Sequence, residues 1–102
     1  MSYRAPIEDM AFALRKLAGI GRLQGEHFAT FDDELIDPIL EEAGKLAADV
    51  LAPLNQAGDE QGSQLTGDGV VAPHGFADAY RQFAEGGRMG LSAPEKWRGQ
   101  GL

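Results

Sequence analysis

The sequence predicts an all-α fold with three main helices, one short hairpin and a glycine-rich C-terminal loop. Three observations predict it. Apolar residues recur at helical spacing in three separate segments. An Asp-Gly pair marks a tight turn, and ten of the 14 glycines lie from Gly58 onward. A chain of 102 residues suits one small domain with a modest core.

The composition excludes several classes of function. Nine basic residues against 16 acidic ones give a net charge of −7, which disfavours nucleic acid and anionic membranes as partners. No apolar run approaches the ~20 residues of a membrane span. The absence of cysteine excludes disulfides and thiolate chemistry. Because Met1–Pro6 does not begin a signal peptide, we expect a cytoplasmic location.

The first predicted helix covers residues 6–18. Its apolar positions are Ile7, Met10, Leu14 and Leu17. Acidic residues lie at its start and basic residues at its end, as the helix dipole favours. The glycines that follow end it, and residues 19–31 are expected to form a connector with one short helical turn.

The second predicted helix, residues 32–56, has the strongest periodicity. One unbroken apolar face is formed by Leu35, Ile39, Ala43, Leu46, Val50 and Leu54, and it is widened by Leu40, Ala47 and Leu51. We therefore expect burial on more than one side.

Both ends of this helix carry signals of their own. Thr30 with Asp33 fits a capping box, although Asp32 fits the cap equally well. Pro38 suits a first turn after a short preceding turn, and Pro53 should bend or loosen the last one. The segment Asn55–Gly58 is expected to end the helix.

A hairpin is predicted at 65–71 and the third helix at 73–85. Pro73 would start this helix and Gly86-Gly87 would end it. Its aromatic residues Phe76, Tyr80 and Phe83 could line a ligand pocket together with Trp97, but an aromatic face at helical spacing is usually core. The remainder, 88–102, has no period and is expected to be an extended, partly buried loop.

The residues indicate no catalytic, cofactor or metal site. His27 and His74 are the only histidines and have no nearby ligand partners. Residues 67–72 match the letters G-x-G-x-x-A, but their β-branched residues favour a hairpin turn over a phosphate loop. The segment around Ser92 lacks the second glycine of a nucleophile elbow. The acidic run from Asp32 to Glu42 is expected to be a solvated face.

Two segments carry a resemblance. Residues 31–59 run from FDDELIDPILEEAGKL to VLAPLN and GD, and residues 75–102 contain GF, Tyr80, GLSAPE and the final GQGL. Together they resemble the N-terminal α-helical domain of acyl-CoA dehydrogenases, especially the long bacterial members. One position departs from the family pattern, because Arg98 stands where a glycine is usual. A positive φ there would strain the turn.

The resemblance implies a small orthogonal helical bundle, with an N-terminal extension at 1–29 and the domain proper at 30–102. Whole members bind FAD, oxidise acyl-CoA thioesters and pass electrons to an electron-transferring flavoprotein. Their catalytic base and main flavin contacts lie in later domains. Only the motif loop is carried over to this sequence, at Pro94, Glu95, Gly99 and Gly101.

On this reading the chain is a fragment that ends at Leu102 and helps to wall the acyl pocket of the full enzyme. Alone it is expected to bind no FAD and to be inactive, and its exposed apolar surface should make it self-associate as a homo-oligomer. The competing interpretation is a stand-alone acidic helical domain that binds a protein partner.

Overall fold

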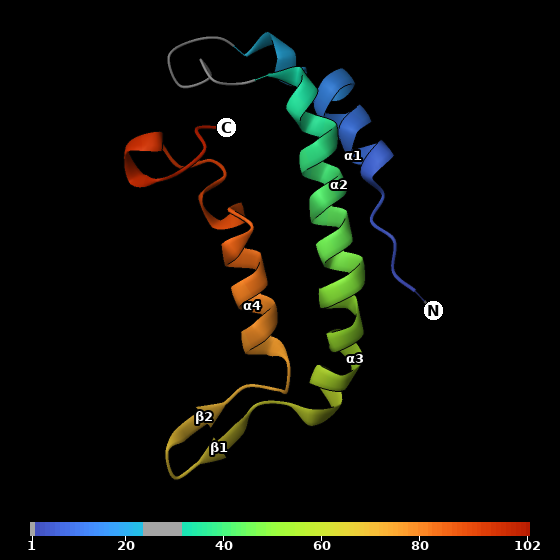
Figure 1. Cartoon of the computed structure of the whole chain (residues 1–102). Helices are drawn as coiled ribbons and strands as arrows, with labels where there is room; N and C mark the ends of the chain where they lie inside the picture. Colours follow the sequence, from blue (N-terminus) through green and yellow to red (C-terminus); the bar gives the residue numbers. More distant parts are fainter. Residues whose placement is uncertain (1, 24–31) are drawn as a thin grey trace.

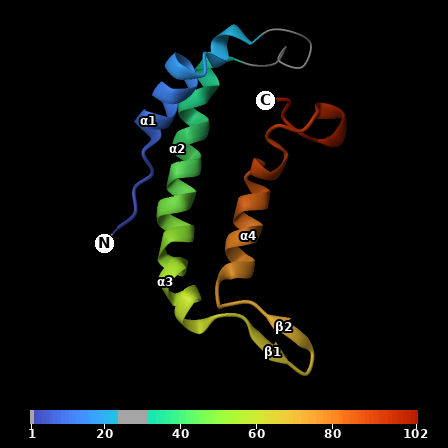
Figure 2. The same cartoon turned by 180° about the vertical axis from the view of Figure 1, so that it is seen from behind.

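A computed structural model describes residues 2–23 and 32–102. The described chain is mostly helical, and its one sheet is the small hairpin β1–β2 (Figure 1). The predicted all-α class is confirmed. In Figures 1 and 2 the helices run side by side, and the later helix α4 returns along the long helix that contains α2 and α3.

The first helix forms where it was predicted. Helix α1 (Ile7–Phe12) continues into a wider π turn (Ala13–Leu17), and Gly19 ends it with a positive φ of 64°. The predicted short turn in the connector is present at Ile20–Arg22. His27 and Thr30 lie outside the described residues.

The second helix is longer than predicted. A short 3-10 turn (Asp33–Leu35) leads into α2 (Ile36–Leu46), a π turn (Ala47–Leu51) and α3 (Ala52–Gln61). Asp32 supplies the cap, because its Oδ1 accepts a hydrogen bond from the backbone N of Glu34 at 3.0 Å. The predicted end at Asn55–Gly58 is wrong, because the helix continues to Gly62, whose φ is 66°.

The π turn divides the predicted apolar face into two. Such a turn holds about one extra residue, so side chains beyond it are rotated by roughly 100° about the helix axis. Before the turn, Gly44 lies against α1, where an added Cβ would be 3.3 Å from Ile7 Cγ2. After the turn, Leu54 and Gly58 face the segment that begins α4. Pro53 lies in the first turn of α3, directly after the wider turn.

The hairpin follows the prediction closely. Strands β1 (Gln64–Thr66) and β2 (Gly69–Val71) pair antiparallel, with Leu65 opposite Val70. Gly69 has the positive φ, 116°, and the hydroxyl of Thr66 donates to its carbonyl at 2.9 Å. The G-x-G-x-x-A letters therefore lie on a hairpin, as the sequence favoured.

Helix α4 (Phe76–Glu85) starts three residues later than Pro73 and ends at Gly86-Gly87 as predicted. Gly75 precedes it with a φ of 89°. An added Cβ there would lie 2.8 Å from Leu54 Cδ2. Glycine is therefore favoured at this position both by the positive φ of the turn and by the close approach of α3.

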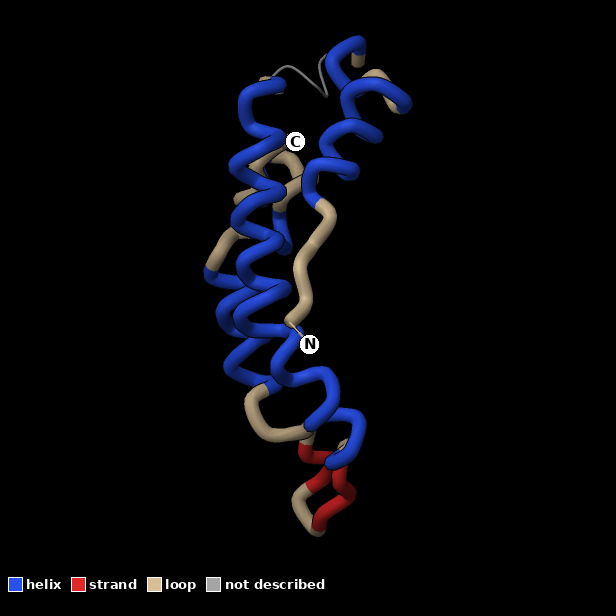
Figure 3. Tube along the Cα trace, turned by 90° about the vertical axis from the view of Figure 1, so that its right-hand side faces the viewer, coloured by secondary structure: helices blue, strands red, loops and turns tan. Residues whose placement is uncertain are grey.

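The core is thin. Among the described residues only Ala11, Ile36 and Ala79 form a buried apolar core. Leu51 is 43% exposed and Ala43 is also exposed, so the expected burial of the long helix on more than one side is wrong. The molecule extends over 52 × 36 × 18 Å, and Figure 3 shows its narrow profile. No helix of the described part has the length and apolar character needed to span a bilayer.

Candidate functional site

The C-terminal loop is the part of the structure that carries the motif positions. It folds back on itself through backbone hydrogen bonds, so the expectation of an extended loop is wrong. The carbonyl of Gly90 accepts from the N–H groups of Ala93 (3.2 Å) and Gln100 (2.9 Å). Leu91 and Ala93 accept from Leu102 and Gly101 at 3.1 and 2.9 Å. The final residues of the chain thus lie beside 90–93.

Pro94 and Glu95 begin the tight turn inside this loop. The Pro94 carbonyl accepts from the N–H groups of Trp97 and Gly99, at 2.9 and 3.1 Å. The Glu95 carbonyl accepts from the N–H of Arg98 at 2.9 Å. These bonds use backbone atoms, which leaves the Glu95 carboxylate exposed in a short 3-10 turn (Glu95–Trp97).

Glycine is favoured at each of the two motif glycine positions, Gly99 and Gly101, for a different structural reason. An added Cβ at Gly99 would lie 2.0 Å from the carbonyl oxygen of Ala93, so only glycine fits there. Gly101 has a φ of 68°. Arg98 is the one non-glycine among the described residues with a positive φ, at 66°. This is the strained conformation that was expected if an arginine replaced the family's usual glycine at this position.

Side chains fix this loop to the rest of the molecule. The Arg88 guanidinium donates to the backbone carbonyl of Glu42 in α2 at 3.3 Å, and the Gln100 amide donates to the Gly87 carbonyl at 3.2 Å. Trp97 remains 72% exposed, with the Lys96 ammonium 5.6 Å from its ring centre. The loop therefore has a defined shape and an exposed aromatic tip.

An apolar groove of about 390 Å³ lies between α3 and α4. Its lining is Leu51, Leu54, Asn55, Phe76, Ala79, Tyr80 and Phe83. One of these lining residues, Phe76, packs on Gly58, where an added Cβ would lie 2.5 Å from the ring. Tyr80 is 61% exposed and Phe76 39% exposed, so the expectation that this aromatic face is core is wrong in this chain.

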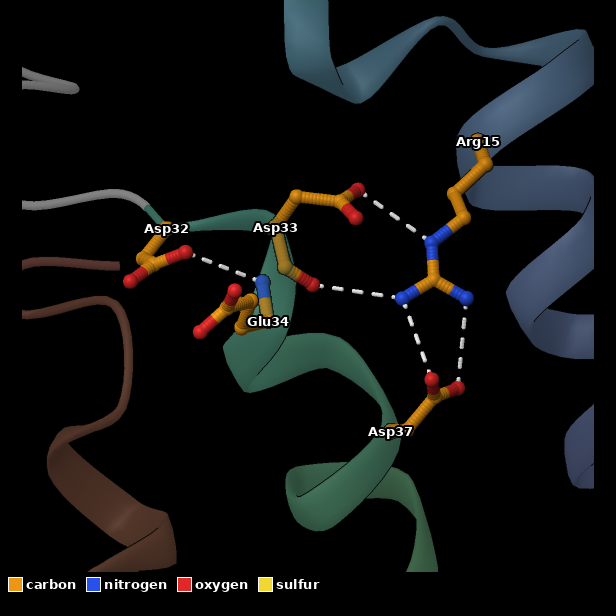
Figure 4. A network of polar contacts seen from close by, with 5 residues as sticks. All are labelled: Arg15, Asp32, Asp33, Glu34 and Asp37. Atoms are coloured by element: carbon orange, nitrogen blue, oxygen red, sulfur yellow. Dashed lines mark hydrogen bonds and ion pairs between the residues drawn. The ribbon is translucent and has the colours of Figure 1, made fainter.

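The acidic side chains of the run from Asp32 to Glu42 are exposed, as predicted, and two of them also belong to an ion-pair network (Figure 4). Arg15 donates to the Asp33 carboxylate through Nε and to both carboxylate oxygens of Asp37, each at 3.2 Å. A further bond reaches the Asp33 carbonyl at 3.2 Å. The hydrogen bonds that Arg15 donates to Asp37, and then those to Asp33, raise the pKa of Arg15. The network joins the π turn that follows α1 to the 3-10 turn Asp33–Leu35 and the first turn of α2.

A second charged group, with exposed side chains, lies on α4. Asp78 accepts hydrogen bonds from Arg81 and from the Gln82 amide, the latter at 2.9 Å. The bond from Arg81, followed by that from Gln82, lowers the pKa of Asp78.

No metal-binding cluster of three or more His, Cys, Asp or Glu residues occurs in ranges 2–23 and 32–102. His74 is exposed, and its backbone N–H donates to the Gln61 side chain at 3.2 Å. Ser92 is exposed too. Within those ranges, the defined features are thus an apolar groove and a shaped loop.

The described residues thus form an apolar groove between α3 and α4 and a C-terminal loop shaped by glycines. No family model matches the chain. Over its whole length the chain is 35% identical to 3-methylmercaptopropionyl-CoA dehydrogenase from Ruegeria pomeroyi. The aligned part is 18% of that protein, at its N-terminal end. This similarity confirms the predicted resemblance to the N-terminal part of acyl-CoA dehydrogenases.

Proposed function

We propose that this chain is the N-terminal helical segment of an acyl-CoA dehydrogenase. The observation that carries the proposal is the similarity to the Ruegeria protein, which extends over the whole chain but covers only 18% of that protein. Further support comes from the loop, where the motif glycines occupy positions that require glycine. The reaction proposed for the full protein is removal of two hydrogens across the Cα–Cβ bond of an acyl-CoA thioester, one as a proton and one as a hydride.

FAD would accept that hydride in the full protein, and an electron-transferring flavoprotein would then reoxidise the reduced flavin. The residues described here do not fit a flavin site. The α3–α4 groove is lined almost wholly by apolar side chains, and no buried polar side chain exists in the described ranges to hold a pyrophosphate. We therefore place no step of the reaction on this chain and propose that alone it neither binds FAD nor catalyses oxidation.

The role proposed for the chain is to support and wall the acyl pocket. The groove offers aliphatic and aromatic side chains, the surface chemistry that an acyl chain or an apolar protein face requires. The motif loop at Pro94, Glu95, Gly99 and Gly101 sets the direction in which the backbone leaves this unit. We retain 1–29 as an N-terminal extension and 30–102 as the domain proper within this proposal.

Complementation tests the proposal. The Ruegeria relative would be truncated by its aligned N-terminal part, and the purified chain would be added back, with dye reduction by acyl-CoA as the measurement. We expect no activity and no flavin absorbance from the chain alone, no activity from the truncated enzyme, and recovery on mixing. Flavin or acyl-CoA oxidation in the chain alone would contradict the inactive role. A truncated enzyme that is fully active would contradict the supporting role.

A further inference from the structure

Gly86, the residue that ends α4, has a backbone conformation open to residues with a side chain. Its φ is −75° and its ψ is 1°, so the backbone does not require glycine there. An added Cβ would instead meet the guanidinium of Arg88, whose Cζ would be 2.9 Å away. The missing side chain at position 86 therefore leaves the space that the Arg88 side chain occupies.

The guanidinium of Arg88 reaches two helices. Its Nη1 lies where a side chain of residue 86 would begin, at the carboxyl end of α4, where the helix dipole favours a cation. Its Nη2 donates to the backbone carbonyl of Glu42 in α2 at 3.3 Å, across 46 positions of the chain. Arginine suits this place because its planar fork directs separate N–H groups toward the two helices.

Arg88 also begins the loop 88–102, which is closed on itself. The Gly90 carbonyl accepts hydrogen bonds from the backbone N–H groups of Ala93 and Gln100, and the Gln100 amide returns to the Gly87 carbonyl at the end of α4. These bonds shape the loop without any contribution from α2. The bond from Arg88 to α2 is therefore suited to set where the loop lies, because other bonds already give it its shape.

We propose that Arg88 is a positioning residue, which fixes loop 88–102 against α2. Gly86 belongs to the same device, since a side chain there would push the guanidinium away from the Glu42 carbonyl. An effect on catalysis rests on the proposed function, in which this loop leads into the rest of an acyl-CoA dehydrogenase. Arg88 would act there only through the place of the loop and would not touch the substrate.

Trp97 reports on the loop, because it is the only tryptophan in the sequence. Arg88→Gln has a shorter, uncharged side chain, so the loop should move more freely and the fluorescence anisotropy of Trp97 should fall. Arg81→Gln is the matched control, because it makes the same replacement on α4, where Arg81 pairs with Asp78. It should leave the anisotropy of Trp97 unchanged.

Hydrogen exchange separates positioning of the loop from its folding. The N–H groups of Gln100, Gly101 and Leu102 bond to carbonyls within the loop, so they should stay protected in Arg88→Gln. A loss of this protection would overturn the positioning role, because Arg88 would then be needed for the loop to fold. Unchanged anisotropy of Trp97 in Arg88→Gln would overturn it as well.

Gly86 provides an independent arm. Gly86→Ala should lower the folding equilibrium constant roughly fivefold, because its methyl group displaces the guanidinium from its hydrogen bond. In an Arg88→Gln background the same substitution should be neutral, since no guanidinium remains to be displaced. An equal loss of stability in both backgrounds, measured by urea denaturation, would overturn the role given to position 86.

A full-length arm uses a chimera in which residues 1–102 replace the aligned N-terminal part of the Ruegeria relative. Arg88→Gln should raise the KM for acyl-CoA roughly tenfold, with kcat and flavin content little changed, because the pocket wall is misplaced. Arg88→Lys keeps the charge and a donor and should recover part of the loss.

The arms distinguish the two proposals. A folded chimera without activity would contradict the proposed function, and the anisotropy, exchange and stability measurements on the chain alone would still decide the role of Arg88. An active chimera whose KM does not respond to Arg88→Gln would overturn the positioning role in catalysis.

Discussion

Arg98 holds the most strained backbone position in the described chain, with a φ of 66° and a ψ of 19°. The left-handed conformation costs a non-glycine residue about 1–2 kcal/mol. Glycine adopts it freely but loses more entropy on folding, about 0.5–1 kcal/mol.

Arg98→Gly is therefore expected to stabilise the chain by about 0.5–1 kcal/mol. The measurement is the free energy of unfolding from urea denaturation. Lys96→Gly is the matched control in the same loop, and it should destabilise the chain, because Lys96 lies in a right-handed 3-10 turn. A loss of stability in Arg98→Gly would mean that the arginine side chain contributes more than its backbone strain removes.

Gly58 is buried within α3 under the ring of Phe76, and an added Cβ would lie 2.5 Å from Phe76 Cζ. Alanine normally stabilises a helix interior by about 1 kcal/mol relative to glycine. Here the clash should reverse the sign, so that Gly58→Ala destabilises by about 1–2 kcal/mol, the range of an overpacked contact.

A double-mutant cycle checks this reversal. In a Phe76→Leu background the ring is gone, and Gly58→Ala should return to neutral or stabilising. Thermal unfolding of the four proteins gives the coupling directly. If alanine stabilises the chain with Phe76 in place, the close approach of α3 and α4 is not as described.

At the scale of elements, the π turn Ala47–Leu51 lets one long helix serve two neighbours. Gly44 before it faces α1, and Leu54 and Gly58 after it face the start of α4. Deleting Ala48 should convert the π turn into an ordinary helical turn and rotate α3 by roughly 100° relative to α2.

The expected result of this deletion is a clear loss of thermal stability, because either α1 or α4 loses its packing surface. The control is deletion of Ser63, which lies between α3 and the hairpin and outside both helices. Equal melting temperatures for the Ala48 deletion and the unaltered chain would contradict the role given to the turn.

Helix α4 also gives the chain a specific pH response. The pKa of Asp78 is lowered by its hydrogen bond from Arg81, so its folded pKa lies below its unfolded one. Its contribution to stability is therefore present above the unfolded pKa, near 4, and is lost as the pH falls through the folded pKa.

Carboxylate titration by NMR should show the Asp78 midpoint rising when Arg81 is replaced by glutamine. Arg15→Gln, which breaks the other network, is the control and should leave the Asp78 midpoint unchanged. An Asp78 midpoint that does not respond to Arg81 would show that the pair is not formed in solution.

For the whole molecule, the sequence predicts the helices and the hairpin well and the packing poorly. Apolar periodicity, the Asp-Gly pair and the Gly86-Gly87 stop are local signals, and each predicted element is present, although the second helix extends to Gln61 and α4 starts only at Phe76. Gly58 resembles a helix end in the sequence, but the structure needs a glycine there because the ring of Phe76, 18 positions later in the chain, packs against it. The bridge from Arg15 to Asp33 likewise joins residues 18 positions apart and leaves no local pattern.

The π turn and the folded terminal loop were missed for a related reason. The π turn Ala47–Leu51 shifts the backbone hydrogen-bond register but does not change the spacing of apolar residues in the sequence. The apolar periodicity therefore continues through Val50 and Leu54 without a visible break. The loop 88–102 is held by backbone atoms, and backbone hydrogen bonds have no signature in side-chain identity. Of the candidate site, the motif glycines were predictable from the family resemblance and the aromatic lining of the groove from helical spacing, whereas the exposure of that lining was not.

The central claim is that this chain is the N-terminal segment of an acyl-CoA dehydrogenase, and a chimera tests it most directly. The aligned N-terminal part of the Ruegeria relative would be replaced by residues 1–102, and acyl-CoA-dependent dye reduction would be measured beside the parent enzyme. A second chimera with Gly99→Ala is the control, because the added methyl collides with the Ala93 carbonyl. We predict that the first chimera retains flavin and activity and that the control loses activity. A folded, flavin-loaded first chimera without activity would contradict the claim.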